Sequence, residues 1–320
     1  MKAKLLVLLA AIMITAPLAQ GVGAPDETRI TLREELLRVI NRDRKQFGLP
    51  SVQLDPFASV VADNYCREQI RNGTSGHFTL DGQAPYMRYS FAGGNDGVSE
   101  NAAAWSANYH FSDRTLYEMM RRSQQAMMNE VAPHDGHRRT ILDPYATHVG
   151  IGLAWEGGEF RLAQEFVRRY IDWSRALPRT ASTTDRLLCS GRPVRGYDIE
   201  AITVHYEPMP RAMSAVTANA IGSYSLPDRR REYLPRLHSY SRLGRGGSVE
   251  VVRQHYADGG WGDFQVADDG SFAFAVPFPD GPGVYTIVVW VRTRGGNEPI
   301  AASDVSIRVS DMAPISYSSR

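Results

Sequence analysis

The feature that most constrains the fold is a change in hydrophobic periodicity about halfway along the chain. Apolar residues recur with helical spacing in residues 31–50, 54–73 and 112–133. An alternating run with a Gly157-Gly158 turn follows at 147–166, and only short alternating runs separated by Gly, Pro and Asp occur later. Helices followed by a hairpin predict an α+β domain, and the short runs predict a second, all-β domain.

Start and stop signals delimit the predicted helices. Thr31 and Glu34 form a capping box, which predicts that the first helix begins there. Asp55 is a typical N-cap for the second helix, and Gly73 a typical stop signal. Pro133 predicts the end of the third helix.

The N-terminal residues 1–24 have the pattern of a signal peptide. Lys2 and Lys4 precede an apolar run at 5–16, which is shorter than the roughly 20 residues needed to span a bilayer. Small residues up to Ala24 offer a cleavage site. We therefore expect a secreted, periplasmic or cell-surface protein, and no later stretch predicts a membrane span.

Composition excludes some functions and supports two domains. The 36 basic and 35 acidic residues are nearly balanced, so no basic stripe predicts a nucleic-acid partner. We expect the first domain at 29–173, a Ser-, Thr-, Arg- and Pro-rich linker at 174–196, and a β-sandwich of immunoglobulin or fibronectin type at 197–310. A tail at 311–320 follows.

Cys66 and Cys189 are the two cysteines of the chain. In an oxidising compartment they are candidates for an intramolecular disulfide, which would stabilise the fold by about 4–5 kcal/mol. The alternative is a buried free thiol at each position, and the sequence leaves both open.

Two histidines and two glutamates lie beside predicted helix ends or loops. His77 follows the second helix, Glu100 lies in a further loop region, Glu130 lies on the apolar stripe of the third helix, and His137 follows Pro133. Imidazole and carboxylate groups together suit a divalent metal ion, zinc above all. The alternative is structural: Glu130 would end a solvated helix, and His137 would cap the next one.

Four sequence boxes give the first domain a resemblance to a known family. The chain carries "VINRDRKQFGLPSVQLDPFASVVA", "HFTLDGQAPYMR", "SEN" and "GHRRTILDPYATHVGIG", in that order. In this order they resemble the bacterial branch of the CAP superfamily, which includes cysteine-rich secretory proteins, insect venom antigens and plant pathogenesis-related proteins. Ser99 and Thr140 depart from the Gly and Asn of the family's boxes, and neither departure removes a side chain expected to bind metal.

The resemblance implies an α-β-α sandwich with a central cleft. It implies that His77 and His137 bind a divalent metal ion, with Glu100 and Glu130 nearby or bound through water. We expect binding of a small amphipathic, peptide, lipid or cell-wall ligand. Two alternatives stay open: a metal-dependent hydrolase with Glu100 or Glu130 as general base, and an adhesion protein acting through the C-terminal sandwich.

Overall fold

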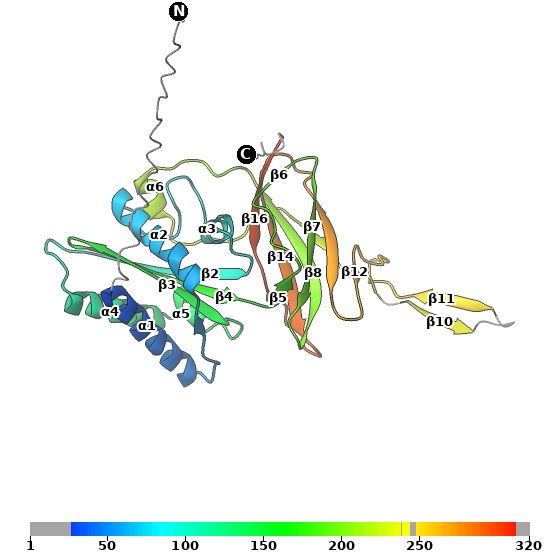
Figure 1. The fold of residues 1–320 in the computed structure, drawn as a ribbon, viewed down its shortest axis with the longest axis horizontal. Helices are drawn as coiled ribbons and strands as arrows, with labels where there is room; N and C mark the ends of the chain where they lie inside the picture. The colour runs from blue at the N-terminus through cyan, green and yellow to red at the C-terminus, as the bar shows by residue number, and fades with distance from the viewer. Residues whose placement is uncertain (1–26, 238, 244–247, 312–320) are drawn as a thin grey trace, which may run out of the picture.

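The computed structural model describes residues 27–237, 239–243 and 248–311. The signal peptide expected at 1–24 and residues 312–320 of the expected tail lie outside these described residues. The described chain forms a mixed helix and sheet domain packed beside a domain made of strands (Figure 1). No helix in the described ranges is long and apolar enough to cross a membrane.

The first domain is a four-stranded sheet with helices on both faces. The strand order is β1-β3-β4-β2, and β2 is an edge strand. Helices α1, α4 and α5 lie on one face, and α2 and α3 lie on the other (Figure 1). This confirms the expected α-β-α sandwich. Its elements are α1 (Glu27–Gln46), β1 (Gln53–Leu54), α2 (Pro56–Asn72), α3 (Pro85–Ala92), β2 (Gly97–Ser106), α4 (Asp113–Met128), α5 (Gly136–Ile141), β3 (His148–Glu156) and β4 (Glu159–Arg168).

Strand β3 packs differently on its two faces because successive side chains point in opposite directions. Val149, Ile151 and Leu153 are fully buried in the cluster formed with α1 and α4. Gly150 and Gly152 face α2, whose backbone lies so close that an added Cβ would overlap it. The V-G-I-G run thus allows one helix to lie directly on the sheet.

The end of α1 fixes the loops around it. The Asn41 side chain both donates to and accepts from the backbone of Val52. Arg44 is fully buried and donates to the carbonyl oxygens of Pro50, Ile141 and Asp143 at 2.7–2.9 Å. These contacts hold the loop that follows α5 against α1.

Helix ends follow the sequence signals in part. Asp55 caps α2 with its carboxylate, and Gly73 ends it in the left-handed conformation, as predicted. Helix α1 begins at Glu27, so Thr31 lies inside the helix and the capping-box prediction is wrong. Helix α4 ends at Met128, five residues before the predicted stop.

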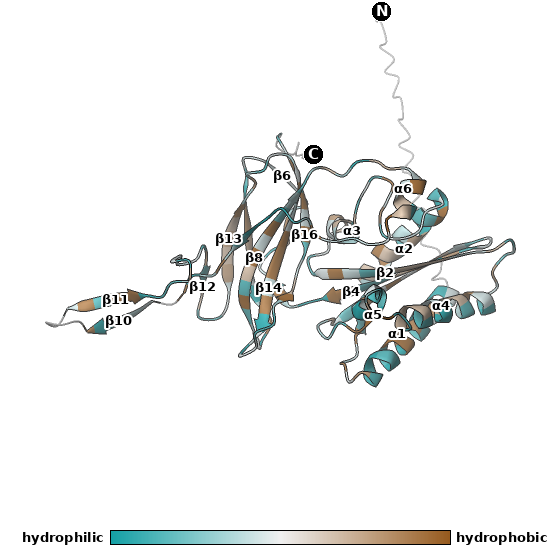
Figure 2. Ribbon diagram, turned by 180° about the vertical axis from the view of Figure 1, so that it is seen from behind, coloured by the Kyte–Doolittle hydropathy of each residue, from teal (hydrophilic) through white to brown (hydrophobic). Residues whose placement is uncertain are grey.

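The second domain is a β-sandwich. One sheet has the strand order β12-β13-β7-β5, and the other has the order β6-β16-β14-β8-β9 with β15 beside β14. Figure 2 shows hydrophobic colouring along the central strands β8 and β14, whose inner side chains fill the core between the sheets. The elements are β5 (Ile171–Trp173), β6 (Thr180–Ser182), β7 (Arg186–Pro193), β8 (Tyr197–Glu207), α6 (Ala215–Ala220), β9 (Arg230–Tyr233), β12 (Gln265–Val266), β13 (Phe272–Pro277), β14 (Gly283–Thr293), β15 (Ile300–Ala301) and β16 (Val305–Ser310). A ribbon of β10 (Ser239–Leu243) and β11 (Val249–Arg253) extends away from it.

The linker predicted at 174–196 is wrong. These residues contain β6 and β7, and β7 lies in the middle of its sheet. Leu187 and Cys189 face inward and alternate with more exposed residues, and Gly191 and Pro193 continue that inner row. Small and polar residues concealed this period-two pattern in the sequence. Strand β5 also belongs to the sandwich, so the first domain ends before residue 171.

The two cysteines do not form the disulfide that the sequence left open. Cys66 lies in the core of the first domain with Ala62, Ala154 and Ala163, and Cys189 lies in the core of the sandwich. Both are free thiols. Burial raises the pKa of Cys66 well above its usual value and that of Cys189 to about 12. The alternative of two buried free thiols is therefore correct.

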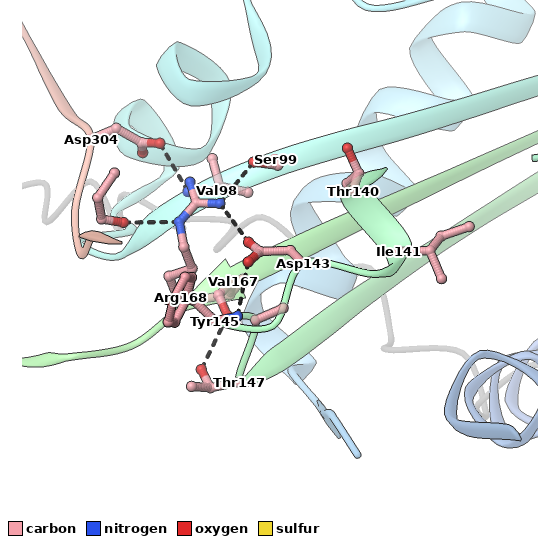
Figure 3. Close-up of polar contacts among 12 residues, drawn as sticks. Val98, Ser99, Thr140, Ile141, Asp143, Tyr145, Thr147, Val167, Arg168 and Asp304 are labelled. Carbon is pink, nitrogen blue, oxygen red and sulfur yellow. Dashed lines mark hydrogen bonds and ion pairs between the residues drawn. The ribbon is translucent and has the colours of Figure 1, made fainter. Parts of the chain in front are cut away.

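Arg168 connects the two domains at the end of β4 (Figure 3). Its guanidinium donates to the carbonyl oxygen of Ala301 in the sandwich at 2.9 Å. It also donates to the Ser99 hydroxyl on β2 and to the Asp143 carboxylate after α5, both at 3.0 Å. One partly buried cation thus joins the sandwich to β2 and to the loop after α5.

Candidate functional site

The structure brings the four predicted site residues together as two pairs. Nδ1 of His77 lies 2.8 Å from Oε1 of Glu100, and Nδ1 of His137 lies 2.5 Å from Oε1 of Glu130. The centroids of the two imidazole rings are 6.3 Å apart. Residues separated by up to 60 sequence positions therefore form one cluster at the edge strand β2.

The first pair is buried and carries a third partner. Glu100 lies on β2 and not in the loop expected from the sequence. Arg88 of α3 forms an ion pair with Glu100 and donates to the backbone oxygen of His77 at 2.5 Å. Burial alone would raise the pKa of Glu100, but Arg88 and His77 outweigh it and lower this pKa below the usual value. Glu100 is thus a carboxylate that accepts from its two neighbours.

Glu165 adds a second buried carboxyl group behind Glu100. The two residues are partners across β2 and β4. Neither oxygen of Glu165 has a hydrogen-bond partner among the described residues, and Nη2 of Arg88 is 3.9 Å away. Burial, followed by the charge of Glu100, raises the pKa of Glu165 well above its usual value. Both effects favour the neutral form of Glu165.

The second pair lies at the start of α5. Glu130 lies beyond the end of α4, in the turn before α5, and not on the helix stripe as predicted. Its Oε2 accepts the backbone N–H of His137 at 2.9 Å, while Oε1 contacts the ring. The carboxylate thus satisfies one of the N–H groups left without a partner at the start of a helix. The structural alternative had His137 as the cap of the next helix, but the carboxylate of Glu130 fills this role and His137 lies inside α5.

The side chains of β2 connect the two pairs. Successive residues of a strand point to opposite faces, so Glu100 meets His77 on the α2 and α3 side. Asn101 points to the α5 side and donates to the backbone oxygen of His137 at 3.1 Å. The S-E-N box therefore contacts both histidines through consecutive residues.

Both histidines present the same ring nitrogen. In each ring Nδ1 donates to a glutamate oxygen, so in the neutral form Nε2 has the free lone pair. The His77 side chain is 8% exposed and the His137 side chain 33%, so the site is approached from the His137 side. No group of three or more His, Cys, Asp or Glu side chains with metal-ligand geometry occurs in the described part of the chain.

Three neighbours of the site were missed in the sequence. Arg88 is the last residue of the "HFTLDGQAPYMR" box, and its place in the same box as His77 was the signal that could have indicated it. Glu165 follows from the register of β2 and β4. Tyr224 comes from the second domain: its hydroxyl accepts the backbone N–H of Glu100 at 2.6 Å, and its ring contacts His77.

Comparison with known proteins confirms the resemblance seen in the sequence. Residues 37–166 match the family described as "CAP: Cysteine-rich secretory protein family". The first domain of this chain is thus similar to the CAP family over these residues. A comparison with curated proteins gives no match.

Six solved chains match in structure. One is an extracellular protein containing an SCP domain from Bacillus anthracis, with 19% identity and a TM-score of 0.35 over 46% of this chain and 44% of that chain. Another is an outer surface protein from Borrelia burgdorferi, with 17% identity and a TM-score of 0.35 over 43% of this chain and 93% of that chain. The match therefore spans less than half the length of the first of these proteins.

Proposed function

We propose that this chain is an exported CAP-domain protein whose His77 and His137 side chains together bind a divalent metal ion, zinc in the first instance. The observation that carries this proposal is the contact of each Nδ1 with a glutamate. Metal-ligating histidines almost always donate their other ring N–H to a carboxylate or carbonyl, which fixes the tautomer and the ring orientation.

The ring separation is close to that of two imidazoles that share an ion. With zinc about 2.0–2.1 Å from each nitrogen in tetrahedral geometry, two ligating rings have centroids roughly 5–5.5 Å apart. The ring centroids of His77 and His137 are 6.3 Å apart, so the two rings would move closer together by about 1 Å on binding a shared zinc ion. Two imidazoles leave coordination positions for water or for a ligand.

Binding is favoured over hydrolysis by the state of both glutamates. Glu100 has no exposed side-chain surface and is paired with Arg88 and His77. Both oxygens of Glu130 already accept from His137. A general base must be within reach of the proton that it removes and must have a pKa near the working pH. The lowered pKa of Glu100 and the occupied oxygens of Glu130 make both poor bases.

A groove between α1 and α4 supports an amphipathic ligand with an anionic head. It has a volume of about 760 Å³, and its lining includes Asn129, the residue before Glu130 in the sequence. Its lining combines apolar side chains with three arginines against two carboxylates: Val39, Phe47, Met128, Arg42, Arg121, Arg122, Asp43 and Glu118. Calorimetry with dodecyl phosphate, and with dodecyltrimethylammonium as the matched cationic control, tests this part. Binding of the anionic amphiphile alone is expected, and equal binding would contradict it.

The metal proposal is tested by zinc content and affinity of the mature protein. Wild type is expected to bind one zinc ion, and His77→Ala and His137→Ala are expected to lose it. His110→Ala, at an exposed position, is the matched control and should bind like wild type. Zinc binding that survives both site substitutions would overturn the proposal.

The proposal that the protein is exported rests on the signal-peptide pattern of residues 1–24. Mass spectrometry of the secreted chain tests it, and cleavage after Ala24 is the expected result.

A further inference from the structure

The connection between β8 and β9 leaves the sandwich and runs over the loop that carries His77. We call residues 208–229 the strap. The backbone N–H of Met213 donates to the Leu80 carbonyl at 2.8 Å. The Asn219 side chain accepts the N–H of Ser75 at 2.7 Å and donates to the carbonyl of Gly73 at 3.2 Å. In both views α6, which lies within the strap, is beside α2 (Figures 1 and 2).

The strap and the loop are in direct backbone contact. Gly82 has a φ of +83°, and a Cβ placed there would lie 2.7 Å from the Arg211 oxygen and 3.1 Å from Cβ of Pro210. Neither segment can shift far without the other, because no side chain lies between them at this point. The position of the His77 loop therefore depends on the sandwich domain.

Tyr224 is the residue of the strap that reaches the site. Its ring lies edge-on to His77, with centroids 5.0 Å apart and an angle of 61° between the planes. Its hydroxyl accepts the backbone N–H of Glu100 at 2.6 Å. One side chain thus contacts the imidazole and the strand residue that orients this imidazole.

We propose that Tyr224 is a positioning residue for the His77 and His137 site, supplied by the β-sandwich domain. This inference rests on the proposed metal-binding function. The ring restricts rotation of the His77 side chain, and the hydroxyl holds β2 at Glu100. The imidazole is thereby held with Nδ1 on the carboxylate and Nε2 available as ligand. Partners of a ligating histidine act in this way, and their removal commonly weakens metal binding 10–100-fold.

The experiment compares three variants of the full mature chain. Tyr224→Phe keeps the ring and removes the hydroxyl, and Tyr224→Ala removes both. Tyr86→Phe is the matched control: its hydroxyl also joins the two domains, by donating to Glu207 at 2.9 Å, and its ring centroid is 6.4 Å from that of Tyr224. Two quantities are measured: zinc affinity by competition with a chelator, and the imidazole nitrogen shifts of His77 and His137 by NMR in the metal-free protein.

We expect Tyr224→Phe to weaken zinc binding about tenfold and Tyr224→Ala to weaken it further, with Tyr86→Phe close to wild type. The nitrogen shifts of His77 should change in both Tyr224 variants, while those of His137 stay constant. Equal effects of Tyr224→Phe and Tyr86→Phe would show that the tyrosines act through domain packing alone and would overturn the proposal. If Tyr224→Ala does not fold, the comparison of Tyr224→Phe with Tyr86→Phe alone tests the positioning role of Tyr224.

The two proposals can fail separately. If wild type binds no zinc, the proposed metal site is wrong, and the NMR measurement still tests the role of Tyr224. Unchanged His77 shifts in the Tyr224 variants would then overturn the positioning role. Changed shifts confined to His77 would support it.

Discussion

Glu100 and Glu165 lie opposite each other on the paired strands β2 and β4, and both are buried beside a single guanidinium. Arg88 forms its close ion pair with Glu100, while its contact with Glu165 is 3.9 Å long. One cation balances one carboxylate, and a second buried charge would cost several kcal/mol. The two carboxyl groups therefore hold one negative charge, on Glu100.

This division of charge predicts different effects of the same substitution at the two positions. Glu165→Gln replaces a neutral carboxyl group by a neutral amide and should change the free energy of unfolding by less than about 1 kcal/mol. Glu100→Gln leaves Arg88 without its counter-charge and should cost about 3–5 kcal/mol. Urea unfolding at neutral pH measures both. Equal losses would show that Glu165 also carries charge.

Glu130→Gln tests the second pair. The amide keeps the size of the side chain but cannot present two acceptor oxygens to the ring and the backbone N–H of His137. We expect zinc affinity to fall about 10–100-fold and stability to fall by about 1 kcal/mol from weaker capping of α5. Calorimetry and urea unfolding are the measurements, with Glu118→Gln, a partly exposed residue of α4 that pairs with Arg114, as control. A loss of stability with unchanged zinc affinity would limit Glu130 to a capping role.

The sequence predicts those parts of the fold that depend on local signals. The cap of α2 at Asp55, its stop at Gly73 and the hairpin of β3 and β4 are correct because neighbouring residues determine them. Strands β2 and β7 were missed because Ala, Ser, Gly and Pro fill many of their positions, so that their alternation is weak. Their burial depends on pairing with distant strands.

The candidate site was also predictable only in part. The four residues were predicted together, and the structure pairs them as His77 with Glu100 and His137 with Glu130. The two pairings depend on strand β2, which carries Glu100, and on the turn that carries Glu130. From the sequence, Glu100 was expected in a loop and Glu130 on a helix. Tyr224 could not be predicted, because its contact depends on how a second domain packs against the first.

The free cysteines predict the behaviour of the protein toward thiol reagents. Cys66 and Cys189 have no exposed surface, and burial raises the pKa of both, so that the reactive thiolate is suppressed. Ellman's reagent should detect neither thiol in the native protein and both after unfolding in guanidinium. The unfolding midpoint should be the same with and without dithiothreitol. A midpoint that falls on reduction would indicate a disulfide.

Asp304 predicts how stability depends on pH. It lies in the sandwich at the domain junction, where Oδ2 accepts the N–H of Val98 at 2.9 Å (Figure 3). Burial raises its pKa to about 7, with a further increase from Asp96 and an opposing effect of Arg168. The folded chain therefore keeps a proton that the unfolded chain loses near pH 4.

The sign follows from proton linkage. Between about pH 4 and 7 the folded chain binds more protons at Asp304 than the unfolded chain, so this group lowers stability as the pH rises, by a total on the order of 4 kcal/mol. Asp304→Asn cannot titrate, so the variant should gain stability relative to wild type as the pH rises through this window. Urea unfolding of both proteins at several pH values measures the difference between their free energies of unfolding. The other titratable groups are the same in both proteins, so their contributions cancel in this difference. Asp172→Asn, at an exposed position of β5, is the control, and its free energy of unfolding should depend on pH in the same way as that of wild type. A constant difference between wild type and Asp304→Asn would mean that Asp304 is ionised throughout and that Arg168 outweighs its burial.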